Sequence, residues 1–150
     1  MPHFRLIMTH LVIDASLVAK WYLRDEQDAG AADSILGGLC AEEIVLCAPL
    51  LLLYEVGNIL FVASSLRNRL TKISAKKVLA NLQKLPINYQ EPDFNKVISL
   101  TLKHNISFYD GAYLQLAKGL DIPFITGDNR LCNKLKGQEK NIFPLNEYRP

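Results

Sequence analysis

The chain has 150 residues, of which 49% are hydrophobic and 21% charged, and its formal net charge at pH 7 is +2. This length fits one domain with a buried core and excludes a disordered tail, and so small a charge does not by itself indicate a partner such as nucleic acid. The three cysteines form no CxxC pair, which predicts reduced thiols in a cytoplasmic protein.

No transmembrane segment is expected from the hydropathy pattern. The longest apolar run, residues 44–54, is interrupted by Pro49 and followed by Glu55. A membrane-spanning helix needs about 20 consecutive apolar residues, so this run is too short.

The first residues resemble a signal peptide only weakly. Arg5 precedes a short apolar run, but no small-residue cleavage site stands out. Met8 is an alternative start, which would leave residues 1–7 as an extension outside a single domain with its core at about residues 11–143.

The first predicted strand, residues 11–13, is a β-branched run typical of buried parallel strands. It ends at Asp14, and a helix with an apolar side follows. Asp14 has two equally good interpretations: an N-cap of that helix, or an acid placed at the carboxyl end of a central strand. A second helix is predicted over residues 26–39 and a second strand over residues 44–47.

A third helix, residues 50–66, is apolar almost all round and is predicted to be buried. It contains Glu55, with Asn58 at i+3 on the same face. A buried Glu is costly unless it is paired or bound to a cation. The alternative is a Glu that reaches solvent or pairs with a Lys, but no basic residue lies one turn away on either side, which favours a functional role.

The middle of the chain predicts two more helices separated by a short strand. Ser74 is predicted as the N-cap of a helix over residues 75–85, and Asp93 as the N-cap of a helix over residues 94–104, because both residue types are preferred at that position. Residues 87–89 lie between them and are predicted as the strand.

The last third of the chain places an acid near each end of a helix–strand unit. Ser107 and Asp110 have the spacing of a capping box at the start of a helix, so Asp110 has a structural interpretation as well as a functional one. Asp128 follows a predicted strand at residues 124–126 within a turn, where Asp is common. A last edge strand is predicted at residues 142–143.

Together these acids form a pattern that none of them shows singly. In an alternating α/β fold with a parallel sheet, strand carboxyl ends and helix N-termini lie at one edge, where ligands bind. Asp14, Glu55 and Asp128 fit that edge, whereas Asp110 follows no strand directly. Carboxylates gathered there would repel one another. A hard divalent cation such as Mg²⁺ removes this conflict, and it can activate water and neutralise a phosphate.

Four short motifs, in order and at suitable distances, resemble those of the PIN domain, and in particular the VapC-like toxins of toxin–antitoxin pairs. They are Val12-Ile13-Asp14-Ala15-Ser16, Glu55 with Asn58, Tyr109-Asp110-Gly111-Ala112-Tyr113, and Thr126-Gly127-Asp128. The resemblance implies a three-layer α/β/α fold with a mainly parallel central sheet. It also implies an Mg²⁺- or Mn²⁺-dependent endoribonuclease, a homodimer and a small cognate antitoxin.

The resemblance also implies site residues. Catalytic and metal-binding roles fall to Asp14, Glu55, Asp110 and Asp128, and supporting roles to Ser16, Asn58 and Thr126. Candidate contacts to RNA phosphates are Lys20, Lys72, Arg130 and Lys134. For each of these four, ordinary solvated surface charge is at least as good an interpretation.

Two other functions are considered beside an endoribonuclease that uses a metal-activated water. A phosphoacceptor receiver domain shares the α/β layout, but it needs adjacent acids after the first strand, and here Ala15 follows Asp14. A non-catalytic PIN scaffold that acts through protein binding is disfavoured because all four acids are present.

Overall fold

The middle of the molecule is a parallel sheet in the order β3-β2-β1-β4-β5. Every neighbouring pair of strands runs parallel, with β1 in the centre. This confirms the predicted parallel sheet, including its last strand at an edge. The strands are β1 (Thr9–Ile13), β2 (Ile44–Ala48), β3 (Asn88–Tyr89), β4 (Phe124–Thr126) and β5 (Ile142–Pro144).

The computed structural model describes residues 8–23 and 27–149. The proposed extension, residues 1–7, and residue 26, at the predicted start of the second helix, lie outside the described residues. Within the described ranges, no helix is both long and apolar enough to cross a membrane.

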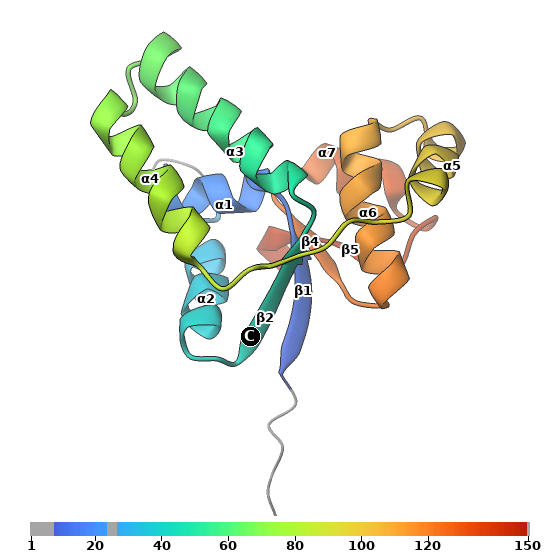
Figure 1. Ribbon diagram of the computed structural model, residues 1–150. Helices are drawn as coiled ribbons and strands as arrows, with labels where there is room; N and C mark the ends of the chain where they lie inside the picture. Colours follow the sequence, from blue (N-terminus) through green and yellow to red (C-terminus); the bar gives the residue numbers. More distant parts are fainter. Residues whose placement is uncertain (1–7, 24–26, 150) are drawn as a thin grey trace, which may run out of the picture.

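Helices cover both faces of the sheet and produce three layers (Figure 1). α1 and α2 lie on one side and α5 and α6 on the other, while α3 and α4 pack against each other and project beyond the sheet. The helices are α1 (Ala15–Tyr22), α2 (Ala29–Cys40), α3 (Leu51–Phe61), α4 (Lys72–Lys84), α5 (Phe94–His104), α6 (Phe108–Leu120) and α7 (Asn129–Leu135), with a π-helical turn η1 (Val62–Leu66) and a 3₁₀ turn η2 (Leu145–Glu147).

Two helices differ from the sequence-based expectation. The predicted cap Ser74 is wrong, because α4 begins one turn earlier, where Thr71 accepts a hydrogen bond from the Ser74 backbone N–H at 3.0 Å. Both hydroxyls are good caps, and the chain enters the helix at the first of them. The predicted third helix is not continuous, since α3 changes at Val62 into the π-helical turn η1.

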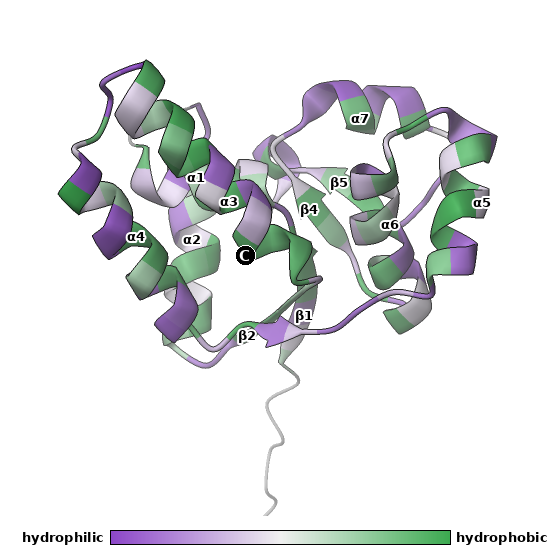
Figure 2. Ribbon diagram, turned by 45° about the horizontal axis from the view of Figure 1, so that its top comes forward, coloured by the Kyte–Doolittle hydropathy of each residue, from purple (hydrophilic) through white to green (hydrophobic). Residues whose placement is uncertain are grey.

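The core forms where β1 and β4 meet α6. The Tyr113 and Phe124 rings stack with centroids 5.7 Å apart, and both side chains are fully buried. In contrast, α4 alternates hydrophobic and hydrophilic residues along its length (Figure 2), as expected for a helix with one side in solvent. This packing holds the carboxyl ends of β1 and β4 close to α6.

Candidate active site

Asp14 directly follows β1 and is held by three hydrogen bonds. Its Oδ1 accepts from the Leu17 backbone N–H at 3.2 Å and from the Ser16 hydroxyl at 2.6 Å, and its Oδ2 accepts from the Thr126 hydroxyl at 2.5 Å. The side chain is 7% exposed. Asp14 is thus both the N-cap of α1 and an oriented carboxylate at the carboxyl end of the central strand, so its two interpretations hold together.

The pKa of Asp14 is raised to about 6. Burial is the main cause, and the nearby charge of Glu55 adds to it, while the hydrogen bonds from Ser16, Thr126 and Leu17 act in the opposite direction. The site therefore holds a carboxylate whose charge is opposed by its surroundings.

Ser16 and Thr126 connect the end of β1 to the turn after β4. Besides its bond to Asp14, the Thr126 hydroxyl accepts from the Asp128 backbone N–H at 3.0 Å. The Ser16 hydroxyl accepts from the Gly127 backbone N–H at 2.9 Å. Asp128 in turn caps α7 by accepting from the Leu131 backbone N–H at 3.1 Å. These bonds bring Asp14 and Asp128, the first and last of the four candidate acids, to one place.

Glu55 reaches the same region from the second turn of α3. Its Oε1 accepts a hydrogen bond of 2.7 Å from the hydroxyl of Tyr113 on α6. Burial raises the pKa of Glu55; the Tyr113 bond lowers it and the charge of Asp110 raises it further. Sequence reasoning gave Tyr113 no role, although its place three residues after Asp110 puts it on the same side of α6.

Asp110 lies in the first turn of α6, where its backbone N–H donates to the Ser107 hydroxyl at 3.0 Å. Burial raises the pKa of Asp110; the Ser107 hydroxyl lowers it and the charge of Asp128 raises it. The charge of Glu55 likewise raises the pKa of Asp14, and that of Asp110 the pKa of Glu55. The four acids therefore form one electrostatically connected series.

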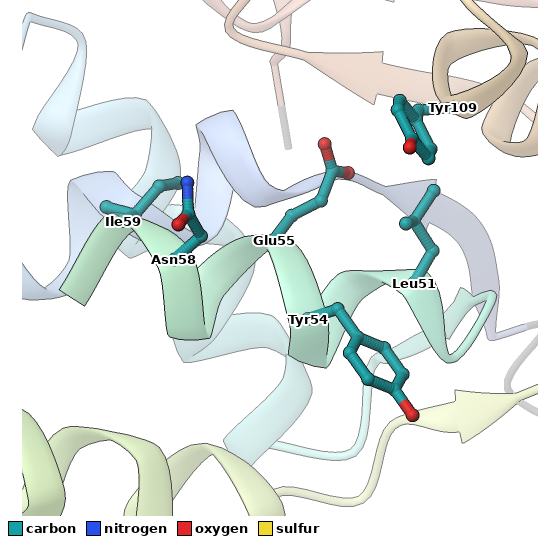
Figure 3. Close-up of a pocket in the computed structure, with 6 residues that line it drawn as sticks. All are labelled: Leu51, Tyr54, Glu55, Asn58, Ile59 and Tyr109. Atoms are coloured by element: carbon teal, nitrogen blue, oxygen red, sulfur yellow. The ribbon is translucent and has the colours of Figure 1, made fainter. Parts of the chain in front are cut away.

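A hollow of about 390 Å³ opens beside Glu55. Figure 3 shows the Glu55 carboxylate directed toward the side from which Tyr109 approaches, with Tyr54 turned the other way. The hollow gives solvent and ligands access to Glu55, the one acid of the series that lines it. Its lining residues are Leu51, Tyr54, Glu55, Asn58, Ile59 and Tyr109.

The acids supply the right atoms for a hard cation, though they are not gathered into a compact cage. In the described part of the chain, no three His, Cys, Asp or Glu side chains stand together as a metal-binding group. The donors are carboxylate oxygens whose mutual repulsion a cation would relieve, which fits Mg²⁺ or Mn²⁺ better than zinc. Mg²⁺ is commonly held by one or two carboxylates while it keeps several waters, so it does not need a cage.

The four basic candidates fall into different surroundings. Lys20 is buried in the last turn of α1, beside Gly127. Lys72 lines a separate hollow between α3 and α4. Arg130 is exposed on α7, and the exposed Lys134 donates a hydrogen bond to the Asn105 backbone oxygen. Ser16 and Lys20 both lie close to Gly127, and the Ser16 hydroxyl donates a hydrogen bond to Asp14. Of the four basic candidates, Lys20 is therefore connected to the acids through Ser16 and Gly127.

Sequence comparisons find known proteins that this chain resembles. The PIN domain family model matches residues 11–136. Ribonuclease VapC1 of Mycobacterium tuberculosis is 37% identical over 131 residues, covering 83% of this chain and 90% of the relative.

Two solved structures share the fold. A Pyrobaculum aerophilum protein superimposes with a TM-score of 0.67 at 19% identity, covering 93% of each chain. Mycobacterium tuberculosis VapC20, described as a sarcin-ricin loop cleaving toxin, has a TM-score of 0.64 at 14% identity, covering 93% of this chain and 99% of that one.

Proposed function

The chain belongs to the PIN domain family and to its VapC ribonucleases, the toxins of toxin–antitoxin pairs, and from this premise we propose that it cuts RNA with four acids and a divalent cation. The acids are Asp14, Glu55, Asp110 and Asp128. The observation that carries this proposal is the orientation of Asp14 by Ser16 and Thr126, together with its raised pKa. An Asp that only caps a helix needs the bond from the Leu17 backbone N–H, but not the bonds from two hydroxyls.

The four acids would hold Mg²⁺ or Mn²⁺, and the cation, when bound, would activate a water and neutralise charge on the phosphate. The chain itself supplies orientation. The Thr126 and Ser16 hydroxyls engage both oxygens of Asp14, which fixes its plane. The Tyr113 hydroxyl donates to one oxygen of Glu55, which orients this carboxylate and leaves its other oxygen for a ligand.

Asn58 has a supporting role in this proposal. It lies at i+3 from Glu55 on α3 and lines the same hollow. Its amide can donate to a phosphate oxygen as well as accept from a ribose hydroxyl. The hollow therefore offers RNA both a carboxylate and a neutral polar group.

The partner would be a small antitoxin that covers this hollow. Apolar side chains stand exposed along α3, η1 and α4 and provide a surface for it. They are Tyr54, Phe61, Leu66 and Ile73. A basic side chain of the antitoxin placed among the carboxylates would compete with the metal for the same oxygens. A homodimer is expected as well, and sedimentation would measure it.

The decisive experiment compares RNA cleavage by three proteins with Mg²⁺ and with EDTA. Wild type should cut only with Mg²⁺, Asp14→Asn should not cut, and Asp121→Asn should cut like wild type. Asp121 makes a matched control because it is exposed and has a left-handed φ of 54°, which Asn also tolerates. Cleavage by Asp14→Asn at the wild-type rate would overturn the proposal, and a wild type that binds its partner but cuts no RNA would indicate a non-catalytic scaffold.

A further inference from the structure

A second hollow, also of about 390 Å³, lies on the other side of Asn58 and Ile59, which line both. It is bounded by α1, by the end of α3 with η1, and by the turn after β4. Besides Asn58 and Ile59, its lining residues are Ser16, Ala19, Lys20, Leu23, Val62, Ala63, Arg67, Arg69 and Gly127. We call it the lysine hollow, after its buried residue Lys20.

Lys20 is 8% exposed. Among the described residues, no carboxylate forms an ion pair with its ammonium group. Burying a charged group without a counter-charge is costly. Lys20 therefore lies at the wall of a hollow without an ion-paired carboxylate among the described residues.

Gly127 explains how the ammonium group reaches this place. A Cβ at residue 127 would lie 2.7 Å from Cε of Lys20 and 3.2 Å from Oγ of Ser16, with Nζ of Lys20 at 3.6 Å. The missing side chain thus leaves room for the end of Lys20 beside the Ser16 hydroxyl. That hydroxyl donates to Asp14, so Gly127 has the end of Lys20 and a direct partner of the first acid as neighbours.

We propose that the lysine hollow binds a phosphate of the RNA backbone next to the phosphate being cut. This proposal rests on the proposed ribonuclease function. It adds the path of the bound RNA, which would run from the acids across Asn58 to Lys20. Arg67 lines the mouth of the hollow and is exposed, so it extends the same positive surface. A backbone phosphate in the hollow would be the ion-pair partner that no described carboxylate provides to Lys20.

A carboxylate of a protein partner could compensate the same lysine. RNA is favoured because Ser16 joins the hollow directly to Asp14, so that one strand would occupy both. The experiment below separates these two ligands.

The test measures binding without cleavage. A fluorescein-labelled, unstructured single-stranded RNA of about 12 nucleotides, of a sequence that wild type cuts, is titrated in EDTA with wild type, Lys20→Met and Lys84→Met. Met has a similar length and no charge. Lys84→Met is the matched control, since Lys84 is an exposed lysine in the last turn of α4 that lines neither the hollow beside Glu55 nor the lysine hollow.

Lys20→Met should weaken binding about tenfold, and the slope of log affinity against log salt should become shallower by about 0.7, the value for one phosphate contact on a single strand. Lys84→Met should keep the wild-type slope. A purely structural role for Lys20 would change the melting temperature but not this slope.

A second measurement leaves the protein unchanged. A single neutral methylphosphonate, on 2′-O-methyl ribose, is moved along the RNA. For wild type, a methylphosphonate at one position beside the cut bond should weaken binding as much as Lys20→Met does. For the Lys20→Met protein, a methylphosphonate at that position should not weaken binding further.

The two proposals fail in different ways. If wild type cuts no RNA in Mg²⁺, the ribonuclease proposal fails. If wild type cuts but Lys20→Met keeps its salt slope and no methylphosphonate position matches it, the phosphate site is overturned. A Lys20→Met that loses only antitoxin binding also overturns it.

Discussion

Single residues in the candidate site combine a structural role with the chemical role that we propose for them. Asp14 and Asp128 cap α1 and α7, and the same carboxylates stand at the carboxyl ends of β1 and β4. Asp110 differs, because the oxygen that caps α6 belongs to Ser107. Asn at position 110 would keep the backbone N–H that donates to Ser107 and lose only the negative charge.

We therefore expect Asp110→Asn to abolish RNA cleavage in Mg²⁺ without destabilising the metal-free protein. Its free energy of unfolding should equal or exceed that of wild type, because one repelling charge is removed from beside Glu55 and Asp128. Cleavage assays and urea titrations check both parts. If Asp110→Asn cuts RNA normally and its free energy of unfolding is about 1 kcal/mol lower than that of wild type, Asp110 only stabilises the N-terminus of α6.

Charge and spacing in the sequence reveal the acids but not what surrounds each residue. Lys20 and Lys72 look alike in sequence, yet one is buried beside Gly127 and the other is exposed. Tyr113 was part of a motif without a role, because its bond to Glu55 joins residues 58 positions apart. Burial and long-range pairing are tertiary properties, so local patterns could not predict them.

At the level of whole elements, α4 provides a clear test of capping. Thr71→Ala should lower the free energy of unfolding by about 1 kcal/mol, because it removes the acceptor of the Ser74 backbone N–H. Ser74→Ala should cost less, since its hydroxyl only accepts from Thr71. Urea unfolding of both variants gives the comparison, and a larger loss in Ser74→Ala would restore Ser74 as the cap.

Most strands were predictable because β2, β4 and β5 and the end of β1 are short, mainly apolar runs, whereas β3 is only the pair Asn88–Tyr89. The change from α3 to η1 was not, since residues 50–66 read as one apolar helix. In η1 the Arg67 backbone N–H donates to the Val62 oxygen, five residues back, at 3.0 Å. This wider turn forms one wall of the lysine hollow, so the irregular element lies at the proposed binding surface.

For the molecule as a whole, the raised pKa of Asp14 makes the stability of the metal-free protein depend on pH. Between the ordinary value of 3.8 and about 6, the folded state binds more protons at Asp14 than the unfolded state does. The free energy of unfolding therefore falls as pH rises through this window, by roughly 3 kcal/mol at about 1.4 kcal/mol for each unit of pKa. The raised pKa values of Glu55 and Asp110 act in the same direction.

In EDTA the melting temperature should consequently decrease from about pH 4.5 to just above pH 6, and millimolar Mg²⁺ should remove most of the decrease by binding the folded site. Asp14→Asn should show a weaker pH dependence and a smaller response to Mg²⁺. Glu139 affects stability at lower pH. Burial would raise its pKa, but the hydrogen bonds from Lys118 and His104 lower the pKa overall. The stability that Glu139 contributes is therefore lost only as pH falls below 4.5. A melting temperature in EDTA that rises steadily up to pH 7 would contradict the assignment.

The pairing of β1 with β4 also determines when during synthesis the chain acquires its site. Val12 pairs with Phe124, and Asp14 receives its hydrogen bond from Thr126, 112 residues later. A growing polypeptide on the ribosome therefore carries Asp14 and Glu55 long before it carries the residues that orient and complete them. The site can therefore form only after translation has passed residue 124, and we expect a polypeptide that ends before Phe124 to cut no RNA.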